Sequence, residues 1–130
     1  MIETYKDLII WQKGIEIVSA AYQFTARFPK EEIYGLTSQM RRAAVSIPSN
    51  IAEGRSRSTR KDFLQFLRIA SGSLAELETQ LIVSEKLGLG DVAHSKKLLA
   101  LLDEEKRMLN SMMKKLKLPP SEKLNSLTAQ

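Results

Sequence analysis

Hydrophobic residues recur along this chain every three or four positions, in four separate segments. In the first segment these positions are Leu8, Trp11, Ile15, Val18, Tyr22 and Thr25. This spacing returns each residue to one face of an α-helix, which has about 3.6 residues per turn. Pro29 follows Phe28 and predicts the end of this helix, because the residue before a proline is pushed away from helical geometry.

A second hydrophobic stripe contains a proline at a position where an uninterrupted helix would not have one. The stripe consists of Ile33, Leu36, Met40, Ala43, Ile47 and Asn50, widened by Ala44 and Ile51. Pro48 removes one backbone donor and costs about 3 kcal/mol in an isolated helix. The pattern predicts a kinked helix that continues to Glu53, with Gly54 as the left-handed residue that closes it.

Two further stripes have clear start and stop signals. The third consists of Phe63, Leu67, Ala70, Leu74, Leu77 and Leu81, and the fourth of Leu98, Leu102, Glu105, Leu109, Met112 and Leu116. Thr59 and Asp62 resemble a capping box before the third helix, and Gly88 is expected to end it. Asp91 is a candidate N-cap for the fourth helix. The cations of Lys114, Lys115 and Lys117 suit the C-terminal end of its dipole.

Four amphipathic helices joined by short links predict an all-α fold. The expected architecture is an antiparallel up-down-up-down four-helix bundle over residues 1–118. Pro119 and Pro120 would stop the last helix, and residues 119–130 are expected to form a flexible tail. No segment alternates between apolar and polar residues with the period of two that a half-buried strand requires.

The amino-acid composition indicates the cellular compartment of this protein and excludes some kinds of site. The 130 residues include no cysteine, which excludes disulfides and thiolate metal sites and is typical of a cytoplasmic protein. No apolar run approaches the roughly 20 residues of a membrane-spanning helix, so we expect no membrane association.

Groups that carry out catalysis are scarce. His94 is the only histidine, and no glutamate stands three residues before it as a di-iron bundle would require. With no cysteine and no phosphate-binding loop, we predict no catalytic residues, no cofactor and no metal. The acidic runs 76–78 and 103–105 are better explained as solvated helix faces. A metal-dependent phosphohydrolase using Glu76, Glu104 and Glu105 is the weakest alternative.

The positive charge of the chain is concentrated in residues 41–68. This stretch holds seven basic residues against two acidic ones, a net charge of +5 that equals the formal net charge of the whole chain. We predict that these side chains bind the phosphates of RNA or DNA, which arginine can hold through two parallel hydrogen bonds. The predicted nucleic-acid-binding residues are Arg41, Arg42, Arg55, Arg57, Arg60, Lys61 and Arg68.

The position of Arg41 and Arg42 complicates this prediction. They precede the other basic residues by more than ten positions, about 20 Å along a helix, so only folding or oligomerisation could unite them with the rest. The cluster also lacks exposed aromatic residues for stacking on unpaired bases, because Phe63 and Phe66 are expected in the core or an interface. Base-specific recognition is therefore not predicted.

Polar residues also interrupt the second hydrophobic stripe. Asn50 occupies a position where an aliphatic residue is the default, and Glu53 follows three residues later. One interpretation is a binding site. The favoured interpretation is a structural polar lock formed by Pro48, Asn50 and Glu53, since a buried amide or carboxylate must find hydrogen-bond partners.

Apolar residues outside the four stripes suggest a protein partner. They include Ile9, Ile10, Ile17, Phe66, Ile69, Ile82 and Val83. A helix that is apolar on more than one face buries both, and a chain of this size has one core, so self-association is expected. The alternative function that follows is a protein–protein adaptor or assembly module without nucleic-acid activity.

A series of motifs resembles one known family. The motifs are Asp7-Leu8-x-x-Trp11-Gln12-Lys13, Phe28-Pro29, Glu32-x-Tyr34-Gly35-Leu36, Gln39-x-Arg41-Arg42-Ala43, Ser46-Ile47-Pro48-x-Asn50-Ile51-Ala52-Glu53-Gly54 and Ser73-Leu74-x-Glu76-Leu77-Glu78-x-Gln80. Together they resemble the four-helix-bundle proteins named after intervening sequences in bacterial 23S ribosomal RNA, over roughly residues 5–117.

The resemblance adds expectations of its own. It implies an antiparallel four-helix bundle that assembles as a homopentamer, in a family with no recognised catalytic residues. It also implies kinship with the accessory protein of diversity-generating retroelements, a pentamer that binds nucleic acid and the reverse transcriptase. A reverse transcriptase is therefore an expected partner if the gene belongs to a retroelement.

Overall fold

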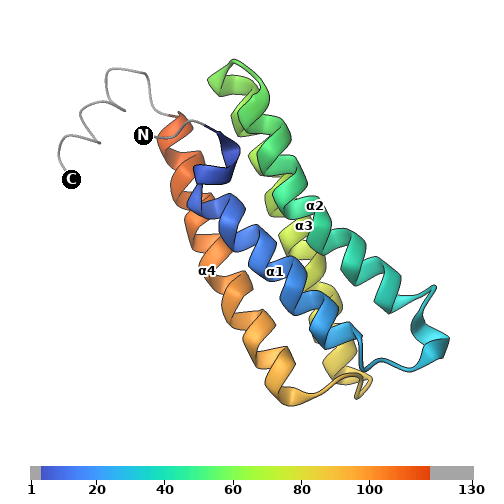
Figure 1. Cartoon of the computed structure of the whole chain (residues 1–130). Helices are drawn as coiled ribbons and strands as arrows, with labels where there is room; N and C mark the ends of the chain where they lie inside the picture. Colours follow the sequence, from blue (N-terminus) through green and yellow to red (C-terminus); the bar gives the residue numbers. More distant parts are fainter. Residues whose placement is uncertain (1–3, 118–130) are drawn as a thin grey trace.

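The computed structural model describes residues 4–117, and these residues form four long helices (Figure 1). The helices are α1 (Ile9–Thr25), α2 (Leu36–Ser56), α3 (Arg60–Lys86) and α4 (Val92–Lys117). Two short 3-10 helices, η1 (Tyr5–Asp7) and η2 (Lys30–Glu32), precede α1 and α2. The described residues contain no strand, so the predicted all-α four-helix bundle is confirmed. The predicted tail, with Pro119 and Pro120, lies outside the described residues.

Contacts between neighbouring helices show how the four helices run. Ser84 near the end of α3 donates a hydrogen bond to the sulfur of Met40 near the start of α2 (3.4 Å). Arg41 near the start of α2 donates a hydrogen bond to Thr25 at the end of α1 (2.9 Å), and Lys13 of α1 pairs with Glu104 at the middle of α4 (2.9 Å). Consecutive helices therefore run in opposite directions, as Figure 1 shows. The α2–α3 link (residues 57–59), the start of α1 and the end of α4 share one end of the bundle, called here the link end.

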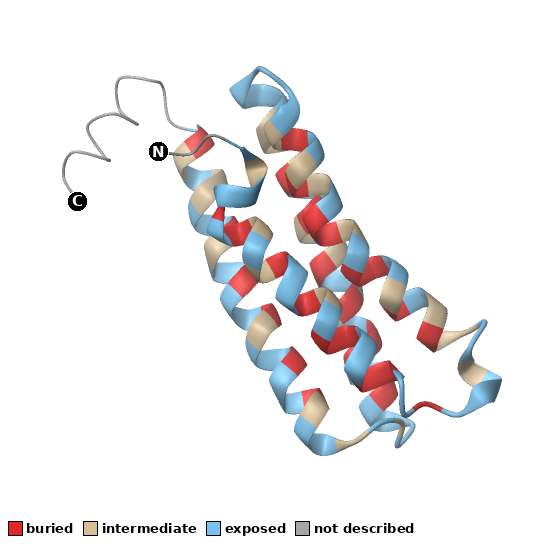
Figure 2. Cartoon of the chain, viewed as in Figure 1, coloured by how far each residue is buried: buried red, intermediate tan, exposed pale blue. Residues whose placement is uncertain are grey.

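The buried face of α1 differs from the predicted one. Ile15 and Tyr22, both in the predicted stripe, are 45% and 42% exposed. The buried positions, coloured red in Figure 2, are Ile10, Gly14, Ile17, Ala20, Ala21, Phe24 and Thr25. A Cβ atom on Gly14 would lie 3.1 Å from Cβ of Pro48 in α2, so the glycine allows a close approach. α1 has two apolar faces, and this approach turns the face with small residues inward.

The start and the end of α2 both differ from the predicted ones. Ile33 lies exposed in the turn before the helix, which begins at Leu36. At the other end the helix runs through Gly54 to Ser56, with Pro48 buried inside it. Gly54 does not adopt a left-handed conformation, because the positive-φ residues of the described chain are Gly88 and Gly90. The kink expected at Pro48 stays a prediction.

The glycine at position 54 is required by packing instead. A Cβ atom placed on it would lie 2.6 Å from the Cβ of Phe66 in α3, closer than real contacts allow. The α2 backbone therefore lies directly against α3 at this point. This contact fixes where α2 ends and where the basic residues that follow Gly54 are placed.

The termini of α3 and α4 follow the predicted signals. The Thr59 hydroxyl accepts a hydrogen bond from the backbone N–H of Asp62 (3.1 Å). After Lys86, Gly88 adopts φ +70° and the N–H of Leu89 donates to the carbonyl of Ser84 (2.9 Å), which is the pattern of a Schellman motif. Asp91 caps α4 by accepting from the N–H of His94 (2.9 Å). Among the described helices, none has the length and apolar character needed to cross a membrane.

Candidate nucleic-acid interface

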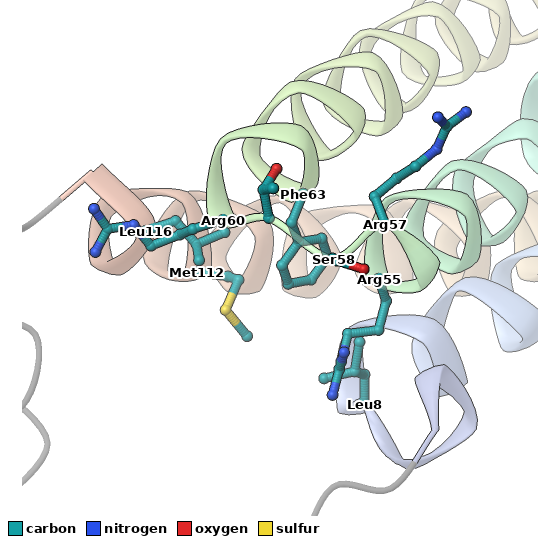
Figure 3. A pocket seen from close by; sticks show the side chains of 9 residues that line it. Leu8, Arg55, Arg57, Ser58, Arg60, Phe63, Met112 and Leu116 are labelled. Atoms are coloured by element: carbon teal, nitrogen blue, oxygen red, sulfur yellow. The ribbon is translucent and has the colours of Figure 1, made fainter. Parts of the chain in front are cut away.

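An open cavity at the link end brings arginine side chains from the end of α2, the link and the start of α3 around an apolar floor. The cavity has a volume of about 330 Å³. Its polar rim consists of Arg55, Arg57, Ser58, Thr59 and Arg60, and its floor of Leu8, Phe63, Met112 and Leu116. In Figure 3 Arg55 extends toward Leu8, Arg60 extends toward Leu116, and Arg57 points away from the floor. We call this site the link-end cavity.

The three arginines differ in the partners they have. Arg57 donates a hydrogen bond to Glu53 (2.8 Å), and its guanidinium lies 5.2 Å from the ring centre of Phe66. No ion pair joins Arg55 or Arg60 to an acidic side chain within residues 4–117. Arg55 is half-buried and Arg60 is exposed. At these two guanidinium groups of the cavity mouth, no acidic side chain of the described chain competes with a ligand for the N–H donors.

Additional positive charge reaches the link end from α4. Lys114, Lys115 and Lys117 occupy the last turn of α4, whose residues Met112 and Leu116 form part of the cavity floor. From the sequence these lysines were expected to stabilise the C-terminal end of the helix dipole, and they were not among the predicted nucleic-acid-binding residues. Their sequence signal, a basic last turn, is common to many helices, and only the antiparallel packing shows that they join the arginines.

The remaining predicted basic residues are not all gathered here. Lys61 and Arg68 are exposed on α3, seven positions apart and so on one face of the helix. Arg41 and Arg42 lie near the opposite end of the bundle. Within one chain, the seven residues predicted as a single nucleic-acid-binding set therefore form two groups. The length of α2 separates the two groups, as expected from their spacing, and nucleic-acid binding by these residues stays a prediction.

Arg41 already has structural partners. Its Nε donates to the hydroxyl of Thr25 in α1 (2.9 Å), and its guanidinium lies 4.4 Å from the ring centre of Tyr22. These contacts join α1 to α2. Arg42 is exposed and, with Arg41 and Val45, lines a separate hollow of about 460 Å³.

The polar residues in the middle of α2 form a small network with α3. The amide of Asn50 donates to the carbonyl and to the hydroxyl of Ser46 (2.8 and 2.9 Å). The hydroxyl of Ser46 lies 2.7 Å from that of Ser73 in α3. Sequence reasoning identified Asn50 but missed the two serines, because Ser46 and Ser73 carry no local signal of pairing.

The other two residues of the predicted polar lock lie elsewhere. Glu53 is exposed and pairs with Arg57, so it takes no part in the Asn50 network. Pro48 is buried and packs against Gly14 of α1, on a different side of α2. Pro48, Asn50 and Glu53 therefore make three separate contacts. Of the three, only Asn50 belongs to the hydrogen-bond network between α2 and α3.

Glu105 is a charged residue type in the core of the bundle. Its side chain is fully buried, and neither carboxyl oxygen has a hydrogen-bond partner in the described residues. Burial raises the pKa of Glu105 to about 8, while the nearby charge of Lys13 lowers it and that of Glu16 raises it. The expectation of a solvated face for the run 103–105 is therefore wrong at Glu105, although its place in the hydrophobic stripe is confirmed.

The acidic residues considered for a metal site do not converge. Among the described residues, no group of three histidine or acidic side chains is placed to hold a metal ion. Glu104 instead pairs with Lys13 (2.9 Å). His94 lies 2.8 Å from a carboxyl oxygen of Asp91, through its Nδ1.

A comparison with protein families covers the helices that build this site. Residues 6–111 match the sequence model of the 23S rRNA-intervening sequence protein family. The chain belongs to this family. The match includes α1, α2, α3 and most of α4, together with the arginine rim of the link-end cavity. A search among curated proteins found no match. Membership in the 23S rRNA-intervening sequence protein family confirms the resemblance seen in the motifs.

Proposed function

We propose that this protein is a non-catalytic, oligomeric bundle that binds the backbone of RNA or DNA through its link end. The observation that carries the proposal is the pair Arg55 and Arg60, which have no acidic partner in the described chain and border an open cavity. Guanidinium groups hold phosphates through charge-assisted hydrogen bonds, often two at a time. The lysines at the end of α4 extend the same positive surface.

Binding of this kind depends on charge rather than on base sequence. Each phosphate that a basic side chain neutralises releases bound counterions, so affinity falls as salt concentration rises. Contacts to phosphates fix the position of a nucleic acid without reading its bases. We therefore expect similar affinities for unrelated sequences and a steep salt dependence.

A triple substitution tests this proposal. Changing Arg57, Arg60 and Lys61 together to Ala is expected to weaken binding roughly tenfold or more at low salt and to flatten the salt slope. The loss is expected to be uniform across sequences. Fluorescence anisotropy with labelled RNA and DNA of several sequences, over a series of salt concentrations, measures both quantities.

A matched control separates a local site from net charge. Lys86, Lys96 and Lys97 are exposed at the opposite end of the bundle. Changing these three to Ala removes the same charge, and its effect on affinity is expected to be small. Equal losses in the two triple variants would show that binding follows net charge, and the link end would not be the interface.

Self-association is the second part of the proposal. Exposed apolar side chains of α1 and α2 meet at a hollow that Tyr22 and Val45 line, and Ile15 is exposed seven positions before Tyr22, on the same face of α1. A surface of this kind is commonly buried in an oligomer. We propose a homo-oligomer, with the pentamer suggested by the family resemblance as its expected size, in the bacterial cytoplasm.

Native mass spectrometry tests the assembly. Val45→Glu is expected to shift the oligomer to smaller species, because it places a charge on the shared apolar surface. Val92→Glu, at an exposed apolar position at the start of α4, serves as the control. A wild-type chain that is monomeric at all concentrations would overturn this part.

A protein–protein adaptor is the second candidate function. It is favoured by Ile69 and Ile82, which are exposed on α3. In this case a protein partner, such as a reverse transcriptase encoded nearby, is retained at high salt and no nucleic acid binds at low salt. The salt series above distinguishes this function from phosphate binding.

A further inference from the structure

The floor of the link-end cavity is unlike a surface that binds phosphate alone. Phe63 and Met112 are half-buried and belong to the residues packed against the core, yet they border open space between Arg55 and Arg60. The charged rim suits a phosphate, whereas these apolar side chains suit the flat face of a nucleobase. An apolar recess with a few convergent polar groups is the usual form of a small-ligand site.

From this arrangement we infer that the link-end cavity holds an unpaired nucleotide of a single strand, with its base on the floor and its phosphate at the arginine rim. The inference rests on the proposed function and adds the form of nucleic acid that the protein prefers. A methionine sulfur makes favourable contacts with aromatic rings, and an arginine can stack on a base. The volume of about 330 Å³ lies within the range of small-ligand pockets.

A second hollow gives the strand a path to continue. It has a volume of about 490 Å³ and shares Leu8 and Met112 with the link-end cavity. Its lining is mostly apolar, from Ile9, Ile10 and Met108, and its polar border holds Lys115, Ser111 and the carboxylate of Asp7. A basic group is thus present on each side of a continuous apolar floor, which matches the alternation of phosphates and bases along a single strand.

A duplex cannot use this floor. Its bases are paired and stacked inside the helix, so it presents phosphates to the arginine rim and leaves the apolar side chains without contacts. The preference for a single strand therefore measures the contribution of the floor, whereas binding to a duplex measures the contribution of the rim.

The test compares a labelled single-stranded RNA of about ten nucleotides with a blunt-ended, two-stranded RNA duplex of similar length that has no unpaired bases. The wild-type full chain is expected to bind the single strand about tenfold more tightly, in line with the effect of a base stacked on a protein side chain. Met112→Ala removes part of the floor without changing charge. It is expected to lower affinity for the single strand several-fold and to leave affinity for the duplex unchanged.

The control is Met113→Ala. Met113 is the next residue of α4 and is half-buried like Met112, but it lines neither hollow. Circular dichroism and thermal unfolding confirm that both variants fold. Equal effects of the two substitutions on single-strand binding would overturn the inference.

A direct measurement supports the same comparison. Irradiation of the complex with a single strand containing 4-thiouridine is expected to cross-link the base to residues of the cavity floor, which peptide mass spectrometry identifies. Cross-links confined to other surfaces would overturn the assignment.

The outcome also separates this inference from the function on which it rests. If single strand and duplex bind equally, and the triple substitution of Arg57, Arg60 and Lys61 weakens both, phosphate binding stands and the cavity assignment fails. If the wild-type chain binds neither RNA at low salt, the proposed function fails and the inference fails with it.

Discussion

The middle of the bundle and its link end offer opposite environments to an ionisable side chain that has no ion-pair partner. In the middle, Glu105 is fully buried without a hydrogen-bond partner, and its raised pKa of about 8 keeps the carboxyl neutral at lower pH. At the link end, Arg55 and Arg60 border open space, where water or a ligand can solvate a guanidinium. A carboxyl removed from water avoids the cost of a buried charge by taking up a proton. A guanidinium at an open cavity is instead accessible to water or to a ligand.

Glutamate and arginine differ in how readily burial changes their protonation. A carboxyl shifts its pKa readily when it is removed from water, whereas a guanidinium stays protonated in proteins. A partly buried arginine must therefore find partners. Arg41 shows this case, with the hydroxyl of Thr25 and the ring of Tyr22 against its guanidinium.

The largest expected effect comes from the buried Glu105, and it is a loss of stability with rising pH. Between pH 4.5 and 8 the unfolded carboxyl of Glu105 is ionised while the folded one still holds its proton, so the folded state binds more protons. Stability falls across this range, by on the order of 5 kcal/mol, and levels off above it. Urea unfolding at several pH values measures the change. The Glu105→Gln variant lacks this contribution, and an identical pH profile in the variant would show that Glu105 is not the buried acid responsible.

The next effect concerns the contact that connects the two regions. Gly54→Ala places a methyl group against the Cβ of Phe66, and we expect a loss of about 2 kcal/mol in the free energy of unfolding. Gly72→Ala is the matched control, since a Cβ there meets no atom within 4 Å. That substitution is expected to add about 1 kcal/mol through helix propensity. Stabilisation by both substitutions would mean that α2 and α3 do not need to approach so closely.

A pair of arginine substitutions tests the division between structural and ligand-binding charge. Arg41→Ala is expected to cost about 1 kcal/mol of stability, because it removes a hydrogen bond and a cation–π contact, with little effect on RNA binding. Arg60→Ala is expected to leave stability unchanged and to weaken RNA binding several-fold. Thermal unfolding and anisotropy on both variants give the four values. The reverse pattern would place the interface at the opposite end of the bundle.

The smallest expected effect is in the seam between α2 and α3. Ser73→Ala breaks the hydroxyl contact with Ser46 and is expected to cost about 1 kcal/mol or less. Thr79→Ala removes an exposed hydroxyl on the same helix that bonds to the carbonyl of Ala75 within α3, and serves as control. Similar unfolding free energies for the two variants would show that the seam network contributes nothing specific.

Parts of the fold that depend on neighbours in the sequence were predictable. The stripe from Leu67 to Leu81 is buried as expected, and Thr59, Gly88 and Asp91 act at the helix ends for which they were identified. The face of α1 was not predictable, because that helix is apolar on two sides. Its orientation depends on Pro48, which is distant in sequence and approaches Gly14 only in the folded chain.

The candidate site was likewise predictable only in its local features. The sequence by itself determined that the excess positive charge lies between residues 41 and 68, and that the helices are amphipathic, because charge counts and hydrophobic periods are local properties of the chain. Only the tertiary structure decided that Arg41 is held by α1, that Arg55 and Arg60 remain without acidic partners in the described chain, and that lysines of α4 join them. Antiparallel packing brings together helix ends that are far apart in sequence, and no local pattern records which ends will meet.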